Sequence, residues 1–231
     1  MLILIFIIIL VIGIVIAASS YSNLLKVYNK YSDNPSSVDT NSLNFISACI
    51  RHYQLDTKIA VIDGELSDAY STKRDIIFLS KDVANGTSVA DISVATHELG
   101  HALQKKDKSS ILAVDYLFGL LNRFANFMLP VALLCCVAFL FFEELAEFVP
   151  LIFYISVGLW FLTILFKIIT IPLELDASKR AYKVLADNKL VSEQELKQTR
   201  EILNAAALTY IGSLFSGAYK ILISLKRSFR R

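Results

Sequence analysis

Long uncharged apolar stretches constrain the fold of this chain more than any other feature of its sequence. Each is about as long as the ~20 residues that a helix needs to cross the hydrocarbon core of a bilayer. The four stretches are Met1 to Ala18, Phe124 to Phe142, Phe148 to Phe166 and Ile202 to Tyr219. Hydrophobic residues make up 55% of the 231 residues, a share that favours membrane insertion over a soluble domain. We therefore expect a mainly α, multi-pass membrane protein.

These stretches predict five parts. Residues 1–18 form an N-terminal anchor, because no basic region precedes a run that is long for a signal peptide. Residues 124–173 form a transmembrane helical hairpin between two polar regions, 19–123 and 174–201. Residues 202–231 form a membrane-associated helix with a basic tail, and this last helix could span the membrane, pack inside a bundle or lie at the interface.

The charges around the hairpin predict an orientation in the cell membrane. The loop between its arms, EELAE, has three acidic residues and no basic one, whereas lysines and arginines flank the opposite ends. The positive-inside rule then places both polar regions in the cytoplasm, although the basic tail disagrees if the last stretch spans. The bilayer is the expected partner. Net charge is only +2 and no basic block is interleaved with aromatic residues, so nucleic-acid binding is not expected.

The first polar region has a readable secondary structure. A helix is expected over residues 42–53, followed by two short strands over 58–63 and 75–79 joined by a wide loop. A second helix is expected after Ser88, which is a plausible N-cap because Asp91 follows three residues later, as in a capping box. The region should therefore be helical with a small β element.

The segment HELGH lies on this second helix. His97 and His101 are four residues apart, so they share one face about one turn apart. Two imidazoles placed in this way can hold one Zn²⁺. Glu98 is rotated by roughly 100° from His97 and can act as general base on a water at the metal. The apolar residues around them are typical of a helix buried beside a site, rather than of a solvated helix that carries His and Glu for solubility.

A third zinc ligand is expected to be a carboxylate. Zinc in hydrolases usually has three protein ligands and an open position for water. His52 is the only other histidine, and Gln104 and Asp107 occupy the positions where a metzincin carries Gly and His. If the hairpin returns the chain to the side it left, the first carboxylates to follow are Glu174 and Asp176, and both are candidates.

Three segments resemble the YugP-type membrane zinc metallopeptidases. They are HELGHALQ, IPLELDASKRA (171–181) and LNAAALTYI (203–211), in this order, and the resemblance extends from the N-terminal anchor to about Ile211. It implies a gluzincin-like site with zinc on His97, His101 and Glu174, and with Glu98 as base. ELDAS is also similar to the E-x-x-A-D helix of HtpX-type membrane proteases. Ser178 replaces the final Asp, which weakens the expected supporting role of that position.

The resemblance also marks one departure. Residues 68–72 usually read D-H-Y-D-P in the family, and this chain has DAYST, so its substrate specificity is expected to differ. Tyr70 is retained and could donate to an oxyanion, or could pack as a loop aromatic.

The predicted function is that of a membrane-embedded, zinc-dependent endopeptidase acting on protein or peptide substrates, membrane proteins included. The strand at 75–79 could pair with an extended substrate. The alternative is a non-enzymatic membrane scaffold with a structural metal. Structural zinc usually has four Cys or His ligands, and no cysteine is placed to join the two histidines.

Overall fold

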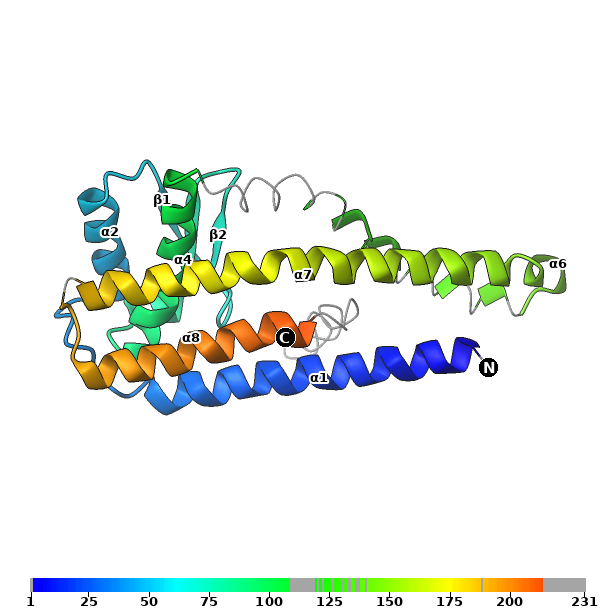
Figure 1. Cartoon of the computed structure of the whole chain (residues 1–231), viewed down its shortest axis with the longest axis horizontal. Helices are drawn as coiled ribbons and strands as arrows, with labels where there is room; N and C mark the ends of the chain where they lie inside the picture. Colours follow the sequence, from blue (N-terminus) through cyan, green and yellow to red (C-terminus); the bar gives the residue numbers. More distant parts are fainter. Residues whose placement is uncertain are drawn as a thin grey trace. The chain divides into compact units, whose positions relative to one another are not determined.

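The computed structural model is mainly helical with one small three-stranded sheet (Figure 1). It describes residues 2–108, 119, 121, 123–125, 127–129, 131–132, 134–135, 138–139, 141–187 and 189–213. The elements in chain order are α1 (Leu2–Tyr31), α2 (Ser42–His52), β1 (Lys58–Ile62), β2 (Ala69–Ser71), β3 (Ile76–Ser80), α3 (Lys81–Asn85), α4 (Val89–Lys106), α6 (Glu143–Ala146), α7 (Val149–Asp187) and α8 (Glu193–Ser213).

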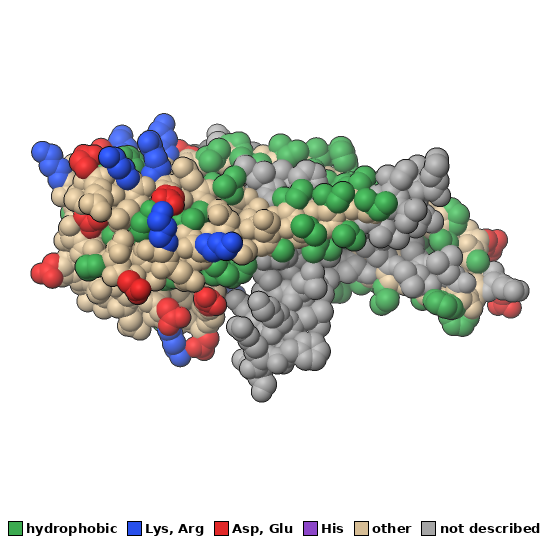
Figure 2. All heavy atoms as spheres, turned by 90° about the horizontal axis from the view of Figure 1, so that it is seen from below, with side chains coloured by type: hydrophobic (Ala, Val, Ile, Leu, Met, Phe, Trp, Pro, Cys, Tyr) green, Lys and Arg blue, Asp and Glu red, His purple; other side chains and the backbone are tan. Residues whose placement is uncertain are grey.

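The chain divides into two compact units. The first, called the apolar unit below, comprises Met1–Tyr21, Leu117–Ile171 and Thr209–Arg231. The second, called the polar unit, comprises Ser22–Tyr116 and Pro172–Leu208. Space-filling representation shows charged side chains gathered on the polar unit and large hydrophobic side chains on the surface of the apolar unit (Figure 2). The two units therefore present different chemistry to their surroundings.

Two helices of the described residues are long and apolar enough to cross a membrane. Their candidate spans are Val11–Tyr31 and Glu144–Asp187. Large hydrophobic side chains are exposed on both, including Val15 at 60% and Leu151 at 58%, which is unusual for a water-facing surface. Much of the predicted first hairpin arm and all of the chain after Ser213 lie outside the described residues, so a multi-pass arrangement stays a prediction.

Helix α7 is continuous for 39 residues and contains Pro172. The apolar residues of the expected second hairpin arm form its first part, and the polar segment after residue 173 forms its last part. A proline inside a helix removes one backbone hydrogen bond, and this helix nevertheless continues past it. Residues of the expected membrane segment and of the expected cytoplasmic segment therefore belong to one element.

The sheet differs from the expected pair of strands. The strands near 58–63 and 75–79 are confirmed as β1 and β3, but they are parallel, with Lys58 opposite Ile76. The loop between them contains β2, which pairs antiparallel with β3 and gives the order β1-β3-β2. The prediction that the strand at 75–79 is open to substrate pairing is therefore wrong, because β3 is hydrogen-bonded on both sides. Three residues, Ala-Tyr-Ser, are too few to show the alternation that identifies a strand.

The core of the polar unit surrounds α4. Fully buried side chains from α2, β3, α4 and the end of α7 form one cluster, which includes Ile46, Ile77, Leu79, Leu99 and Leu185. Helix α4 begins as predicted. The Ser88 hydroxyl accepts a hydrogen bond from the backbone N–H of Asp91, and the Asp91 carboxylate accepts one from the backbone N–H of Ser88. This capping box fixes where α4 starts and so fixes which residues face the core.

Candidate metal centre

Helices α4 and α7 bring three side chains of the polar unit together. His97 and His101 lie on one face of α4, and Glu174 lies on α7 two residues after Pro172. The Oε2 atom of Glu174 is 3.3 Å from the Nε2 atom of each histidine. The three candidate ligand atoms all lie within 4.8 Å of one another, and the side chains are about nine-tenths buried. The arrangement is that of a small buried N, N, O cluster.

Gly100 allows α4 and α7 to approach this closely. A Cβ atom at this position would lie 2.4 Å from the carbonyl oxygen of Ala177, far inside van der Waals contact. Gly100 directly precedes His101, and Ala177 follows Glu174 by three residues. The absence of a side chain at Gly100 therefore brings the backbone of α7 against α4 at the level of the cluster.

The outer nitrogen of each imidazole has a partner of its own. Gln104 places Oε1 3.0 Å from Nδ1 of His101, while its Nε2 atom donates to the carbonyl of Leu173 and to Asp176, both at 2.8 Å. Because Nε2 of Gln104 is used as a donor, Oε1 is left to accept from Nδ1–H of His101. With Nδ1–H held by Gln104, Nε2 faces Glu174, and a metal that displaces the proton of Nε2 would be bound by this nitrogen.

Ser178 has the corresponding position beside the other histidine. Its Oγ atom lies 3.3 Å from Nδ1 of His97. A neutral hydroxyl thus makes the contact at this position, and the weakening expected from the replacement of Asp by Ser stays a prediction.

The donor set fits a metal cation. Oε2 of Glu174 is buried and accepts no hydrogen bond within the part of the chain that the structure describes. Few buried acceptors in proteins lack a donor, and those that do often face an ion. Two imidazole nitrogens and one carboxylate oxygen are the ligands of many hydrolytic zinc sites, which leave a fourth position open.

Asp176, the other candidate carboxylate, is directed elsewhere. It accepts hydrogen bonds from Gln104 and from Nε of Arg180, the latter at 2.7 Å, and Arg180 also contacts Asp107. His52 is exposed at the end of α2 and packs against Tyr53. Neither Asp176 nor His52 joins the cluster.

The charges at the cluster are strongly coupled. Burial alone would lower the pKa of His101, but the Glu174 carboxylate outweighs it and raises that pKa to about 9. Glu98 is buried next to the cluster, and this burial raises the pKa of its carboxyl although the neighbouring imidazoles oppose the rise. A second buried carboxyl group therefore lies beside the candidate ligands.

Tyr70 lies in β2 beside the cluster. Its ring is nearly parallel to that of His101, with the centroids 6.4 Å apart. Its hydroxyl donates to Asp75 at 2.8 Å, and Asp75 also pairs with Lys105. The side chain thus packs against a candidate ligand while its hydroxyl is held by a carboxylate.

Comparison with known proteins identifies a family. The family model described as "Putative neutral zinc metallopeptidase" matches residues 4–227. The "Putative membrane protease YugP" of Bacillus subtilis (strain 168) is 28% identical over 167 residues, which cover 72% of this chain and 71% of that relative. No solved structure matches the chain.

Proposed function

The chain belongs to the neutral zinc metallopeptidase family, a membership that implies Zn²⁺, and from it we propose a membrane-embedded, zinc-dependent endopeptidase. The observation that supports the proposal best is the cluster of His97, His101 and Glu174, with its unsatisfied carboxylate oxygen and the buried Glu98 on the same helix. We assign the three clustered residues as zinc ligands and Glu98 as the general base.

The proposed mechanism gives each residue a separate task. Bound Zn²⁺ would supply Lewis acidity, which polarises the scissile carbonyl and lowers the pKa of the attacking water. Glu98 accepts the proton of that water and delivers it to the leaving amine. Gln104 and Ser178 hold the imidazoles in orientation. The burial of Glu98 favours its protonated form, which suits the second half of this proton transfer.

A substrate strand can be received at the edge of the sheet. Among the described residues β2 is an edge strand, because only β3 pairs with it, and its Tyr70 lies against His101. We propose that an extended peptide pairs with the free edge of β2, which takes the place that the sequence suggested for β3. Backbone pairing of this kind would hold a peptide in an extended form near His101, which Tyr70 of β2 faces.

The membrane arrangement is proposed from the apolar helices and the charge pattern. The relative from Bacillus carries the name of a membrane protease, and the two candidate spans include most of α1 and all of α7. We propose a multi-pass protein of the cell membrane with the polar unit in the cytoplasm and the EELAE loop outside. Labelling of single cysteines in a cysteine-free background tests this topology. A membrane-impermeant thiol reagent applied to intact cells should label Glu144→Cys and spare Lys106→Cys, and the reverse pattern would place the site outside.

Glu98→Gln tests the enzyme against the scaffold alternative. The variant should retain zinc, because Glu98 is not assigned as a ligand, and should lose about 10²–10⁴-fold of its proteolytic rate. Glu193→Gln, on the exposed start of α8, is the matched control and should leave both quantities unchanged. A Glu98→Gln variant that cleaves at the wild-type rate would refute the assignment of the base. A protein that binds zinc stoichiometrically, with no cleavage that depends on Glu98, would favour the scaffold.

A further inference from the structure

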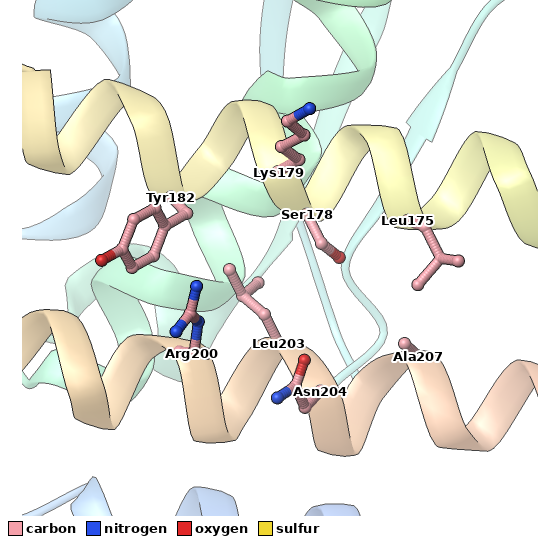
Figure 3. Close-up of a pocket in the computed structure, with 8 residues that line it drawn as sticks. All are labelled: Leu175, Ser178, Lys179, Tyr182, Arg200, Leu203, Asn204 and Ala207. Carbon is pink, nitrogen blue, oxygen red and sulfur yellow. The ribbon is translucent and has the colours of Figure 1, made fainter.

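A cavity of about 200 Å³ lies between α7 and α8 in the polar unit. Its lining residues are Leu175, Ser178, Lys179, Tyr182, Arg200, Leu203, Asn204 and Ala207 (Figure 3). The last three belong to the segment LNAAALTYI, one of the three family motifs, which contributes nothing to the zinc cluster. This motif therefore lines a second site.

The cavity changes character along its length. Leu175 and Ala207 line one end, and Tyr182 and Arg200 line the other (Figure 3). The apolar end adjoins the part of α7 that continues back into its long apolar stretch, and Leu175 is itself 51% exposed. A molecule that fits both ends of the cavity has an apolar part at Leu175 and a charged part about two helical turns away, at Arg200.

Arg200 is the charged group that faces into the cavity. Its guanidinium lies 5.3 Å from the ring of Tyr182, whereas Lys179 points away from α8 (Figure 3). The nearby carboxylates are already engaged: Glu201 pairs with Lys30, and Asp176 pairs with Arg180. Among the described residues no carboxylate forms an ion pair with Arg200, so its charge is free to bind an anion.

We propose that this cavity binds an anionic phospholipid. The phosphate group contacts Arg200, and the first carbons of the acyl chains contact Leu175 and Ala207. Guanidinium groups bind phosphate oxygens well, and basic groups at the cytoplasmic surface are attracted to anionic lipids. The inference rests on the membrane insertion proposed above. None of the proposed zinc ligands lines the cavity, so lipid binding can be measured whether or not the protein is a peptidase.

Ser178 connects the cavity to the candidate metal centre. This residue lines the cavity, and its hydroxyl also contacts Nδ1 of His97. A lipid in the cavity therefore lies against the side chain that orients a proposed zinc ligand.

Native mass spectrometry of the full-length protein in a neutral detergent tests the lipid site. Phosphatidylglycerol and phosphatidylcholine with the same acyl chains are added in parallel. The wild type should retain one phosphatidylglycerol in preference to phosphatidylcholine, and Arg200→Ala should weaken this retention by about fivefold or more. Arg200→Lys should restore part of it. Lys197→Ala removes an exposed cation one turn earlier on α8, outside the cavity, and should change nothing.

A second variant separates the cavity from general surface charge. Ala207→Trp fills the apolar end and keeps Arg200, and it should also release the phospholipid. Zinc content measured on the same samples shows that each variant is folded, and a failure of the peptidase proposal would leave the retained lipid unchanged. Equal retention of both lipids, or undiminished retention in Arg200→Ala, would overturn the proposal. So would displacement of the lipid by equimolar inorganic phosphate or by an acidic peptide.

Discussion

Two glutamates of the polar unit are almost equally buried and have opposite surroundings. Glu174 in the candidate metal cluster is 8% exposed, and Glu195 in the first turn of α8 is 7% exposed. Glu195 accepts hydrogen bonds from the amide and hydroxyl of Ser37, at 2.5 and 2.6 Å, and from the amide of Ser192 at 2.7 Å. The Ser192 hydroxyl in turn accepts a hydrogen bond from the backbone N–H of Glu195, so the two residues form a capping box at the start of α8.

The difference distinguishes a structural carboxylate, Glu195, from a proposed metal ligand, Glu174. Burial alone would raise the pKa of Glu195, but the donors of Ser192 and Ser37 outweigh it and lower that pKa to about 2. Glu174 faces two imidazole nitrogens instead of backbone amides, and its Oε2 atom lacks a hydrogen-bond donor among the described residues. The charge of Glu195 is thus balanced by hydrogen-bond donors of the fold. The charge of Glu174 is balanced by the two imidazoles, which outweigh its burial and lower its pKa to about 2, and a metal cation is suited to take over this role.

Removing the carboxylates one at a time should give the largest difference in bound zinc. Glu174→Ala leaves two imidazoles as ligands and should lose most of the bound zinc, a larger loss than the 10–100-fold of a typical supporting residue. Glu195→Ala and Asp176→Ala should retain zinc. Metal analysis of the three variants, purified alike in detergent, measures the effect. If Asp176→Ala loses zinc and Glu174→Ala keeps it, the assigned ligand is wrong by two residues.

Gly100→Ala should separate the helices that form the cluster. The new methyl group would meet the carbonyl of Ala177, so α7 must shift, and overpacking of this kind costs about 1–3 kcal/mol. Both zinc affinity and thermal stability should fall. Gly158→Ala is the matched control within α7, because a Cβ there meets no described residue within 4 Å. Equal behaviour of the two variants would contradict the close approach.

Gln104→Ala tests the orientation of a single ligand. The change removes the partner of Nδ1 on His101 and should weaken zinc binding by about 10–100-fold. Asp107→Ala disturbs the far end of the same network, at Arg180, and should have little effect on zinc. Competition with a chelator of known affinity measures both. A similar loss in the two variants would point to general destabilisation of the unit.

Zinc removal should expose the coupling between His101 and Glu174. In the zinc-free protein the pKa of His101 is raised from 6.5 to about 9, so this pair contributes stability that is complete below pH 6.5 and disappears as the pH rises through 9. Imidazoles bound to zinc are already deprotonated, so the loaded protein should lose no stability in that window from this cause. Thermal unfolding from pH 6 to 9.5, with and without a chelator, gives the two curves. Parallel curves would exclude the coupling.

Glu195→Gln should have the smallest effect. The variant keeps the size of the side chain and loses its charge, which should cost about 1–2 kcal/mol of stability at neutral pH and leave zinc unchanged. The pKa of Glu195 is lowered from 4.5 to about 2, so its stabilisation is present above pH 4.5 and is lost as the pH falls towards 2. The difference between variant and wild type in thermal unfolding should therefore shrink in acid. A constant difference would assign the effect to packing.

The parts of the fold that could be predicted from sequence are those encoded locally. The capping box at Ser88 and the i, i+4 histidines depend on spacings within one helix, and both are present in α4. β2 could not be predicted, because it exists only by pairing with β3.

Contacts between distant segments could not be inferred from the sequence. From the sequence, Gln104 served only to exclude the metzincin class of proteases. Its position three residues after His101, on the same helix face, could also have indicated a contact with that imidazole. That Ser178 would contact His97, and that Gly100 would meet Ala177, depends on how α7 crosses α4. The two glutamates differ in this respect. Glu195 follows Ser192 by three residues, the local spacing of a capping box, whereas nothing near Glu174 in the sequence shows that it faces two imidazoles.

The long sequence separation between the proposed ligands affects when the site can form during synthesis of the chain. Glu174 follows His101 by 73 residues, and much of the apolar stretch of the chain lies between them. At about 5–20 residues per second, a ribosome needs about 4–15 s to add that length. During this interval the growing chain carries both histidines and the proposed base but lacks the carboxylate ligand. If Glu174 is the third zinc ligand, as proposed, the zinc site is complete only after the apolar stretch between the ligands has been synthesised.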